Sequence, residues 1–182
     1  MACCSADGVV AVLTHNPDDT WTTKTFRDCN LGCNSVAWAP FSNGSPPRLC
    51  TGGCDSRIRL WALEEEEWKE DRSLGNGGHR DWVRDVAWCP VSEAGADCIA
   101  SCGEDGQVLL WTSDGTTFNP SLVHQFPEPV WRVSFSVTGN VLAVSSGESD
   151  VSLWKREVGG RWSKVGEVED GSGEGGERGG RR

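Results

Sequence analysis

The sequence predicts an all-β fold made of repeated four-stranded antiparallel sheets, and three observations predict it. The chain of 182 residues carries ten Trp and no Tyr, as expected for a large core residue that recurs once per repeat. Short segments alternate apolar and polar residues and are separated by turn residues. Three such units align at a period of about 40–50 residues, which is typical of β-propeller blades.

The three units share the same order of landmarks. The aligned segments are 33–61, 83–111 and 130–154. Each begins with an alternating strand, such as CNSVAW or VRDVAW, and a loop containing Pro or Gly follows. A second strand then enters an acidic turn, and a third strand is predicted to end at Leu-Trp. A fourth, more polar strand follows, and in two units it carries Trp68 or Trp162.

The N-terminal segment matches the pattern from its middle. Residues 5–13 resemble an acidic turn and a third strand, with Leu13 in the place of Trp, and residues 21–26 resemble a fourth strand. We therefore expect half a blade here, whose third strand has lost the strands that it should pair with. The expected units are a half blade at 1–28, full blades at 29–77, 78–127 and 128–168, and a disordered Gly-rich, charged tail at 169–182. The prediction is a partial propeller of about three and a half four-stranded blades.

Composition excludes several classes of protein. The formal net charge of −10 argues against a broad surface for nucleic acid or anionic membranes, which needs clustered Lys and Arg. No apolar run approaches the roughly 20 residues that span a bilayer. Residues 1–12 lack the basic and apolar regions of a signal peptide, so we expect a cytosolic or nuclear protein.

An arc of blades with open edges is expected to aggregate, to pair edge to edge or to need a partner.

The nine cysteines are expected to be reduced and to serve as small core residues. Three pairs have a spacing of four: Cys29 and Cys33, Cys50 and Cys54, and Cys98 and Cys102. On a strand, residues four apart lie roughly 13 Å from each other, which is too far for a disulfide or a shared zinc ion. A metal site would need cysteines from different strands, and we expect neither a metal nor a cofactor.

The repeats resemble WD repeats, and they are similar to one WD-repeat family in particular. The strings that carry the resemblance are GCNSVAWAP, TGGCDSRIRLW, HRDWVRDVAWCP, IASCGEDGQVLLWT and VLAVSSGESDVSLWK. They resemble the second half of the small WD-repeat subunits of the outer COPII vesicle coat, over roughly residues 2–165. That family also serves in the Y-shaped scaffold of the nuclear pore and in a lysosomal complex of amino-acid signalling.

The resemblance implies a hydrogen-bonded chain of four side chains inside a blade. One unit has all four positions, namely His79, Ser101, Asp105 and Trp111. The carboxylate accepts from the imidazole and from turn N–H groups, the imidazole reaches the hydroxyl, and the hydroxyl accepts from the indole. A hydrolase triad of His79, Ser101 and Asp105 is the competing interpretation. It is disfavoured because no nucleophile elbow surrounds Ser101.

The other units are expected to hold incomplete versions of this chain. The first full unit keeps Thr51, Asp55 and Trp61. Cys29 lies near the position of the histidine in that unit. The last unit has Glu148 in place of the aspartate and Val144 in place of the hydroxyl.

By resemblance, the function is that of a non-enzymatic scaffold in ER-to-Golgi vesicle transport and in the nuclear pore. Family members are six-bladed open propellers, and a larger coat subunit donates a seventh blade by β-augmentation. The partners that the resemblance implies are this coat subunit and a scaffold subunit of the nuclear pore. It places the chain in the cytoplasm, at ER exit-site coats and at the nuclear envelope, with only an indirect membrane association.

Two alternatives remain open. The first is a truncated isoform or gene copy that no longer assembles, because the first half of the family protein is absent. The second is an enzyme, which the sequence disfavours. His15, His79 and His124 lie far apart in the repeat pattern, and the acidic run 64–67 is most simply a solvated hairpin.

Overall fold

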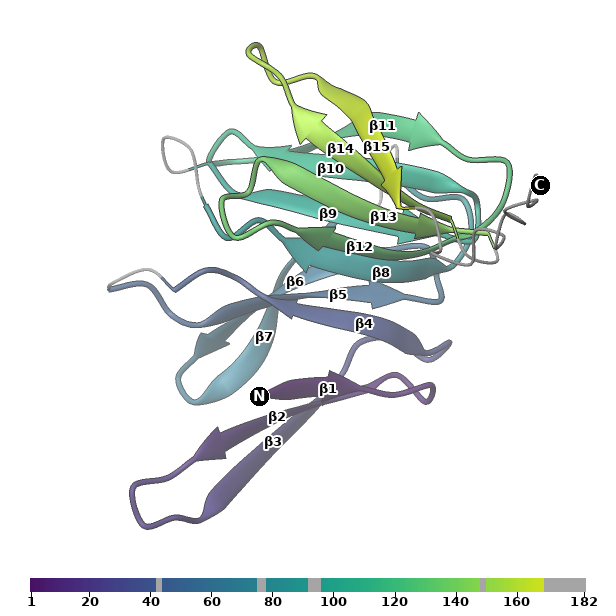
Figure 1. Ribbon diagram of the computed structural model, residues 1–182. Coiled ribbons are helices and arrows are strands. Elements are labelled where there is room, and N and C mark those ends of the chain that lie inside the picture. The colour runs from purple at the N-terminus through teal and green to yellow at the C-terminus, as the bar shows by residue number, and fades with distance from the viewer. Residues whose placement is uncertain (42–43, 75–77, 92–95, 148–149, 169–182) are drawn as a thin grey trace, which may run out of the picture.

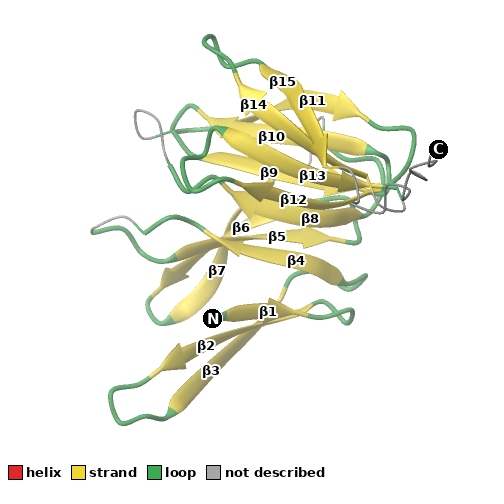
Figure 2. Ribbon diagram, in the orientation of Figure 1, coloured by secondary structure: helices red, strands yellow, loops and turns green. Residues whose placement is uncertain are grey.

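The computed structural model describes residues 1–41, 44–74, 78–91, 96–147 and 150–168. Fifteen strands in these residues form four antiparallel sheets, and Figure 2 shows strands and loops throughout them. None of these residues belongs to a helix long and apolar enough to cross a membrane. The predicted all-β fold of partial propeller blades is confirmed. The tail predicted at 169–182 and the position of Glu148 lie outside the described residues.

Three sheets have four strands each, and every strand pairs with its neighbours in sequence. The second sheet contains β4 (Cys33–Trp38), β5 (Arg48–Gly53), β6 (Ile58–Glu64) and β7 (Glu67–Leu74). The third contains β8 (Val83–Trp88), β9 (Cys98–Gly103), β10 (Gln107–Ser113) and β11 (Phe118–Gln125). The fourth contains β12 (Val130–Phe135), β13 (Val141–Ser146), β14 (Asp150–Arg156) and β15 (Trp162–Val168).

The first sheet has three strands, β1 (Ala2–Cys4), β2 (Val9–His15) and β3 (Trp21–Arg27). The expectation that the third-strand segment has lost its partner is wrong, because β1 pairs with β2. A tight turn makes this pairing possible. Gly8 adopts a φ of +81°, which favours glycine, and its N–H donates to Ser5 O at 2.9 Å. The small residues of β1 then continue the sheet.

The third strand of each full unit runs past its Trp, so the prediction that it ends at Leu-Trp is wrong. β6 continues to Glu64 because it keeps pairing with β7 up to the pair Glu64–Glu67. The two residues between them, Glu65 and Glu66, have positive φ values of 51° and 69°, as a two-residue hairpin turn requires. The acidic run is therefore a hairpin, as predicted.

The sheets follow one another along an arc, with their first strands side by side. β1 lies beside β4, β4 beside β8, and β8 beside β12. Figure 1 shows the first sheet, in purple, at one end of this series and the later sheets stacked at the other. This arrangement buries the faces between neighbouring sheets and leaves the fourth strands toward the outside.

The core consists of layers between neighbouring sheets. Trp61 packs with Val12 of the first sheet and Leu49 of its own. Trp111 belongs to the layer between the second and third sheets, and Trp154 to the layer between the third and fourth. Each repeated Trp therefore packs back onto the sheet that precedes its own, which explains why one large aromatic residue recurs per unit.

Candidate functional site

The third sheet contains an unbroken chain of four buried polar side chains. Trp111 Nε1 donates to Ser101 Oγ at 2.8 Å, and Ser101 Oγ lies 2.8 Å from His79 Nε2. His79 Nδ1 lies 3.0 Å from Asp105 Oδ1. Since the carboxylate only accepts, His79 donates from Nδ1, and its Nε2 accepts the Ser101 proton. The structure brings together the four residues named from the sequence.

Asp105 ends this chain and also anchors the turns around it. Its carboxylate accepts from Arg80 N at 2.8 Å and from Gln107 N at 3.1 Å. Burial acts to raise the pKa of Asp105, but the hydrogen bonds from His79 and these N–H groups outweigh it and lower the pKa below 3.8. The ionised carboxylate is therefore the form that the fold stabilises.

Replacing Asp105 with alanine is expected to lower the free energy of unfolding by about 1–3 kcal/mol at neutral pH, because the N–H donors of the buried residues His79 and Gln107 lose their acceptor. A carboxyl group with a lowered folded-state pKa stabilises the fold above its unfolded pKa, and this contribution is lost as pH falls through the folded value. The difference between wild type and variant should therefore shrink below about pH 4. Urea unfolding at neutral and acidic pH measures it. An equal difference at both pH values would contradict the role assigned to the carboxylate.

The same geometry argues against a hydrolytic role for His79, Ser101 and Asp105. Ser101 is 0% exposed and lies within the strand β9, so no substrate carbonyl reaches its hydroxyl. Its oxygen already accepts from the Trp111 indole. The chain of side chains joins strands and turns within the sheet, which is a structural role.

In the second sheet, a different pair of residues completes the hydrogen-bonded chain of side chains. Trp61 Nε1 donates to Thr51 Oγ1 at 3.0 Å, and Thr51 donates to Asp28. Arg59 then bridges two carboxylates, with Nη1 3.3 Å from Asp28 Oδ2 and Nη2 2.5 Å from Asp55 Oδ2. The side chains of Asp28 and Arg59 are 0% and 9% exposed. Thr51, Asp55 and Trp61 are thus connected through a buried ion pair.

Sequence reasoning missed both members of that ion pair. Cys29 was expected near the histidine position, but its Sγ donates to Gly32 O at 3.2 Å, and the preceding residue, Asp28, contacts Thr51 instead. A carboxylate is shorter than an imidazole, so Arg59 spans the remaining gap to Asp55. A charged residue inside an apolar strand was the available signal, because Arg59 aligns with Leu109 of the next unit.

In the fourth sheet, the Trp and the hydroxyl that accepts its indole hydrogen bond lie on the same strand. Trp154 Nε1 donates to Ser152 Oγ at 2.9 Å, and both residues belong to β14. Val144 was expected to leave the indole without a hydroxyl from the second strand, and Ser152 supplies one from two residues before the Trp. Every repeated Trp therefore donates to a hydroxyl, although the hydroxyl comes from two different positions.

A second set of hydrogen bonds joins the sheets to one another. Ser35 Oγ of β4 donates to Asp85 Oδ1 of β8 at 2.6 Å. Asp85 Oδ2 accepts from the backbone N–H of Val133 in β12 at 3.1 Å. One buried carboxylate therefore connects the first strands of three consecutive sheets and fixes their spacing along the arc.

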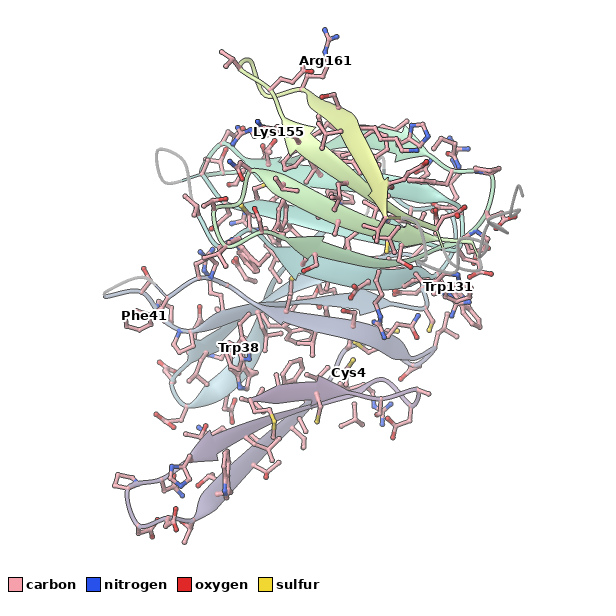
Figure 3. The ribbon with its side chains drawn as sticks, in the orientation of Figure 1. Cys4, Trp38, Phe41, Trp131, Lys155 and Arg161 are labelled. Carbon is pink, nitrogen blue, oxygen red and sulfur yellow. The ribbon has the colours of Figure 1, made fainter. Side chains whose placement is uncertain are left out.

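Two exposed Trp side chains form a surface at the start of β8 and β12, the first strands of the third and fourth sheets. Trp82 and Trp131 are 47% and 42% exposed. Arg84 lies between them, with its guanidinium carbon 5.2 Å and 4.9 Å from the two ring centroids. Glu104 holds the guanidinium, with Oε2 2.7 Å from Arg84 Nε. We call these four residues the Trp–Arg surface, and Figure 3 labels Trp131.

A pocket of about 340 Å³ lies beside the loop between β4 and β5. It is lined by Trp38, Ala39, Pro40, Phe41, Ser45, Pro46, Pro47 and Arg48. Figure 3 shows Trp38 and Phe41 on the opposite side of the view from Trp131. Within the described part of the chain, no three His, Cys, Asp or Glu side chains are grouped so that they could hold a metal ion. The Trp–Arg surface and this pocket are therefore the candidate surfaces for contact with a partner.

Comparison with known proteins matches this architecture to a repeat family. The family model described as WD domain, G-beta repeat, matches residues 20–62, 71–112 and 120–155. The chain is 41% identical to "Protein SEC13 homolog" of Homo sapiens over 187 residues, which cover 93% of this chain and 58% of that protein. It is 40% identical to "Protein transport protein sec13" of Aspergillus fumigatus, covering 93% of this chain and 59% of that protein.

A third relative is also similar, and the chain covers only part of each relative. "Protein SEC13 homolog" of Drosophila melanogaster is 35% identical, with 91% of this chain and 51% of that protein covered. The chain thus spans about half to three fifths of the length of these relatives. The burial of Ser101 argues against a hydrolytic site at this residue. The chain belongs to the WD-repeat family, and it is SEC13-like over more than nine tenths of its own length.

Proposed function

We propose that this protein is a structural subunit of a protein-transport coat, of the COPII type, and of the nuclear pore scaffold. The observation that carries the proposal is the 41% identity to a SEC13 homolog over 93% of the chain. The similar Aspergillus protein is named for protein transport. The four sheets act as consecutive blades, bounded near residues 28, 77 and 127, and the blades present surfaces to protein partners.

The partners proposed are the large coat subunit that donates a blade and a scaffold subunit of the nuclear pore. The chain then works in the cytoplasm, at vesicle coats on ER exit sites and at the nuclear envelope. It contacts membranes only through these assemblies. The net charge of −10 supports protein rather than nucleic acid as the partner.

The Trp–Arg surface is the part of this chain best suited to contact a partner. Trp and Arg are the residues that most often dominate the binding energy of protein interfaces. Here the Arg84 guanidinium is held by Glu104 and stacks on both indoles, so the surface is ordered before binding. A surface that is already ordered loses little conformational entropy when a partner covers it.

Direct binding of the purified full chain to the purified large coat subunit tests the proposal, and the pore scaffold subunit is tested in parallel. We expect binding to at least one of them. We also expect the double variant with Trp82→Ala and Trp131→Ala to bind roughly 10-fold or more weakly. Val158→Ala is the matched control, because Val158 is fully exposed on the hairpin between β14 and β15.

The outcomes separate the function from the surface assigned to it. If a folded wild-type chain binds neither subunit, the transport role is wrong, and a chain that no longer assembles is favoured. If wild type and the double variant bind equally well, the role stands and the contact lies elsewhere. Circular dichroism and thermal melting confirm that each variant keeps the fold of the wild type.

A further inference from the structure

The two end sheets of the arc each have one face that no other described sheet covers. Inside the chain, the repeated Trp of each sheet points to the preceding sheet, as the core layers show. We call this side the leading face of a sheet and the opposite side its trailing face. The trailing face of the first sheet lies on the second sheet, and the leading face of the fourth lies on the third. The leading face of the first sheet and the trailing face of the fourth therefore lie at the two ends of the series (Figure 1).

The leading face of the first sheet carries apolar side chains. Leu13 of β2 takes the position of the repeated Trp and is partly exposed, whereas Trp111 is 1% exposed at the same position of the third sheet. Side chains alternate along a strand, so Ala11 and His15 point to the same side as Leu13. Trp21 of β3 is paired with His15, lies on this face and is 57% exposed.

The trailing face of the fourth sheet repeats the apolar positions of an internal layer. Val151 and Leu153 of β14 correspond to Val108 and Leu110 of β10, which are 0% and 3% exposed because the fourth sheet packs on them. Val151 and Leu153 are partly exposed, and Val168, which is paired with Val151, is 54% exposed. The fourth sheet thus presents the surface on which, elsewhere in the chain, a following sheet packs.

The hairpins at the outer ends of these two sheets carry opposite charges. The turn between β2 and β3 contains Asp18 and Asp19, and the side chain of Asp19 is 96% exposed. Lys155 of β14 and Arg161 in the turn before β15 are exposed, and neither forms an ion pair with another described residue. Figure 3 labels both cations, at the end of the molecule away from the first sheet.

Neighbouring sheets of this chain already use such a contact between their hairpins. Lys24 of β3 reaches the tip of the hairpin of the second sheet, with Nζ 2.5 Å from Glu66 Oε2. If a first sheet followed a fourth sheet in the same manner, its acidic hairpin would lie beside the basic hairpin of Lys155 and Arg161. The two open faces are therefore complementary in charge as well as apolar.

We propose that two copies of this chain close into one ring of eight sheets, in which the leading face of each copy packs on the trailing face of the other. Two-fold symmetry makes the two contacts identical, so the ring closes and no end face stays open. Eight sheets lie within the range that propellers form. A sheet face of this size covers roughly 300–400 Å². Two contacts then bury on the order of 1,400 Å² in total, which is the size of a stable interface.

Analytical ultracentrifugation of the purified full chain over a range of concentrations tests the proposal. We expect a discrete dimer of about 39 kDa, twice the chain mass of 19.7 kDa. Leu13→Glu and Leu153→Glu should each weaken the dimer roughly 10-fold or more, because each buries an unpaired charge in both contacts. An equal mixture of the two variants should form dimers again, through the one contact in which both faces are native.

Leu122→Glu is the matched control, because Leu122 is 56% exposed on β11 of the third sheet and belongs to neither end face. It should leave the dimer unchanged. A wild-type chain that stays monomeric, or that grows into larger oligomers without limit, would overturn the proposal. So would a face variant that dimerises like wild type, since pairing of like faces or of outer strand edges would then hold the copies together.

Charge reversal at the hairpins tests the direction of the contact with substitutions that leave the core intact. The double variant with Lys155→Glu and Arg161→Glu should weaken the dimer roughly 5-fold or more, because like charges then face each other. Adding Asp18→Lys and Asp19→Lys to the same chain should restore it. A quadruple variant no tighter than the double variant contradicts the proposed contact. Circular dichroism and thermal melting check that every variant keeps the fold.

Discussion

Replacing Trp111 with alanine is expected to lower the free energy of unfolding by about 3–5 kcal/mol. Trp111 is 1% exposed and lies in the core layer between the second and third sheets. The truncation leaves a large cavity, removes the donor to Ser101 and weakens the contact between two blades. Urea or guanidinium unfolding, followed by circular dichroism, measures the change. A loss below about 1 kcal/mol would mean that the layer refills the cavity.

Two phenylalanine variants separate the hydrogen bond of Trp111 from its volume. Trp111→Phe removes the indole N–H and should still cost about 1–2 kcal/mol, because the buried Ser101 loses a partner. Trp88→Phe is the matched control in the same core layer. Among the described residues, Trp88 Nε1 is a buried donor without an acceptor, so losing it should cost clearly less than the same change at Trp111. Equal costs would contradict the importance given to the hydrogen bond.

Replacing Asp28 with alanine is the second change with a large expected effect, a loss of about 3 kcal/mol. The carboxylate accepts from Thr51 and pairs with Arg59, and both partners are buried. Its removal leaves part of a buried guanidinium without a counter-charge and the Thr51 hydroxyl without an acceptor. Asp55 still pairs with Arg59, which keeps the loss toward the lower end of that known for broken buried pairs.

The variant Asp28→Asn tests whether the negative charge of Asp28 is needed. Burial is the largest influence on the carboxyl group, and it raises the pKa of Asp28 although Thr51 and Arg59 act to lower it. Burial thus makes the negative charge unfavourable at this position, and an amide oxygen can accept the same hydrogen bonds. We expect a loss of about 1 kcal/mol or less. If asparagine and alanine cost the same in chemical denaturation, the charge itself is what the second sheet needs.

The sequence alone determined the architecture, because a propeller blade repeats its landmarks. The alternation of strands such as VRDVAW and the recurrence of Trp61, Trp111 and Trp154 follow from the period of a half-buried strand and from one core position per unit. The chain of four side chains from His79 to Trp111 follows from the resemblance to WD repeats. They occupy the positions that the repeat family uses.

The places where this chain departs from its own repeat depend on how the sheets pack together. Asp28 and Arg59 replace a histidine, and Ser152 supplies the hydroxyl that Val144 lacks. Such substitutions depend on distances between strands, which no spacing along the chain reveals. The same holds for β1, a strand of three residues that is too short to show an alternation. Local periodicity encodes the blades, but contacts between blades arise only when the sheets pack.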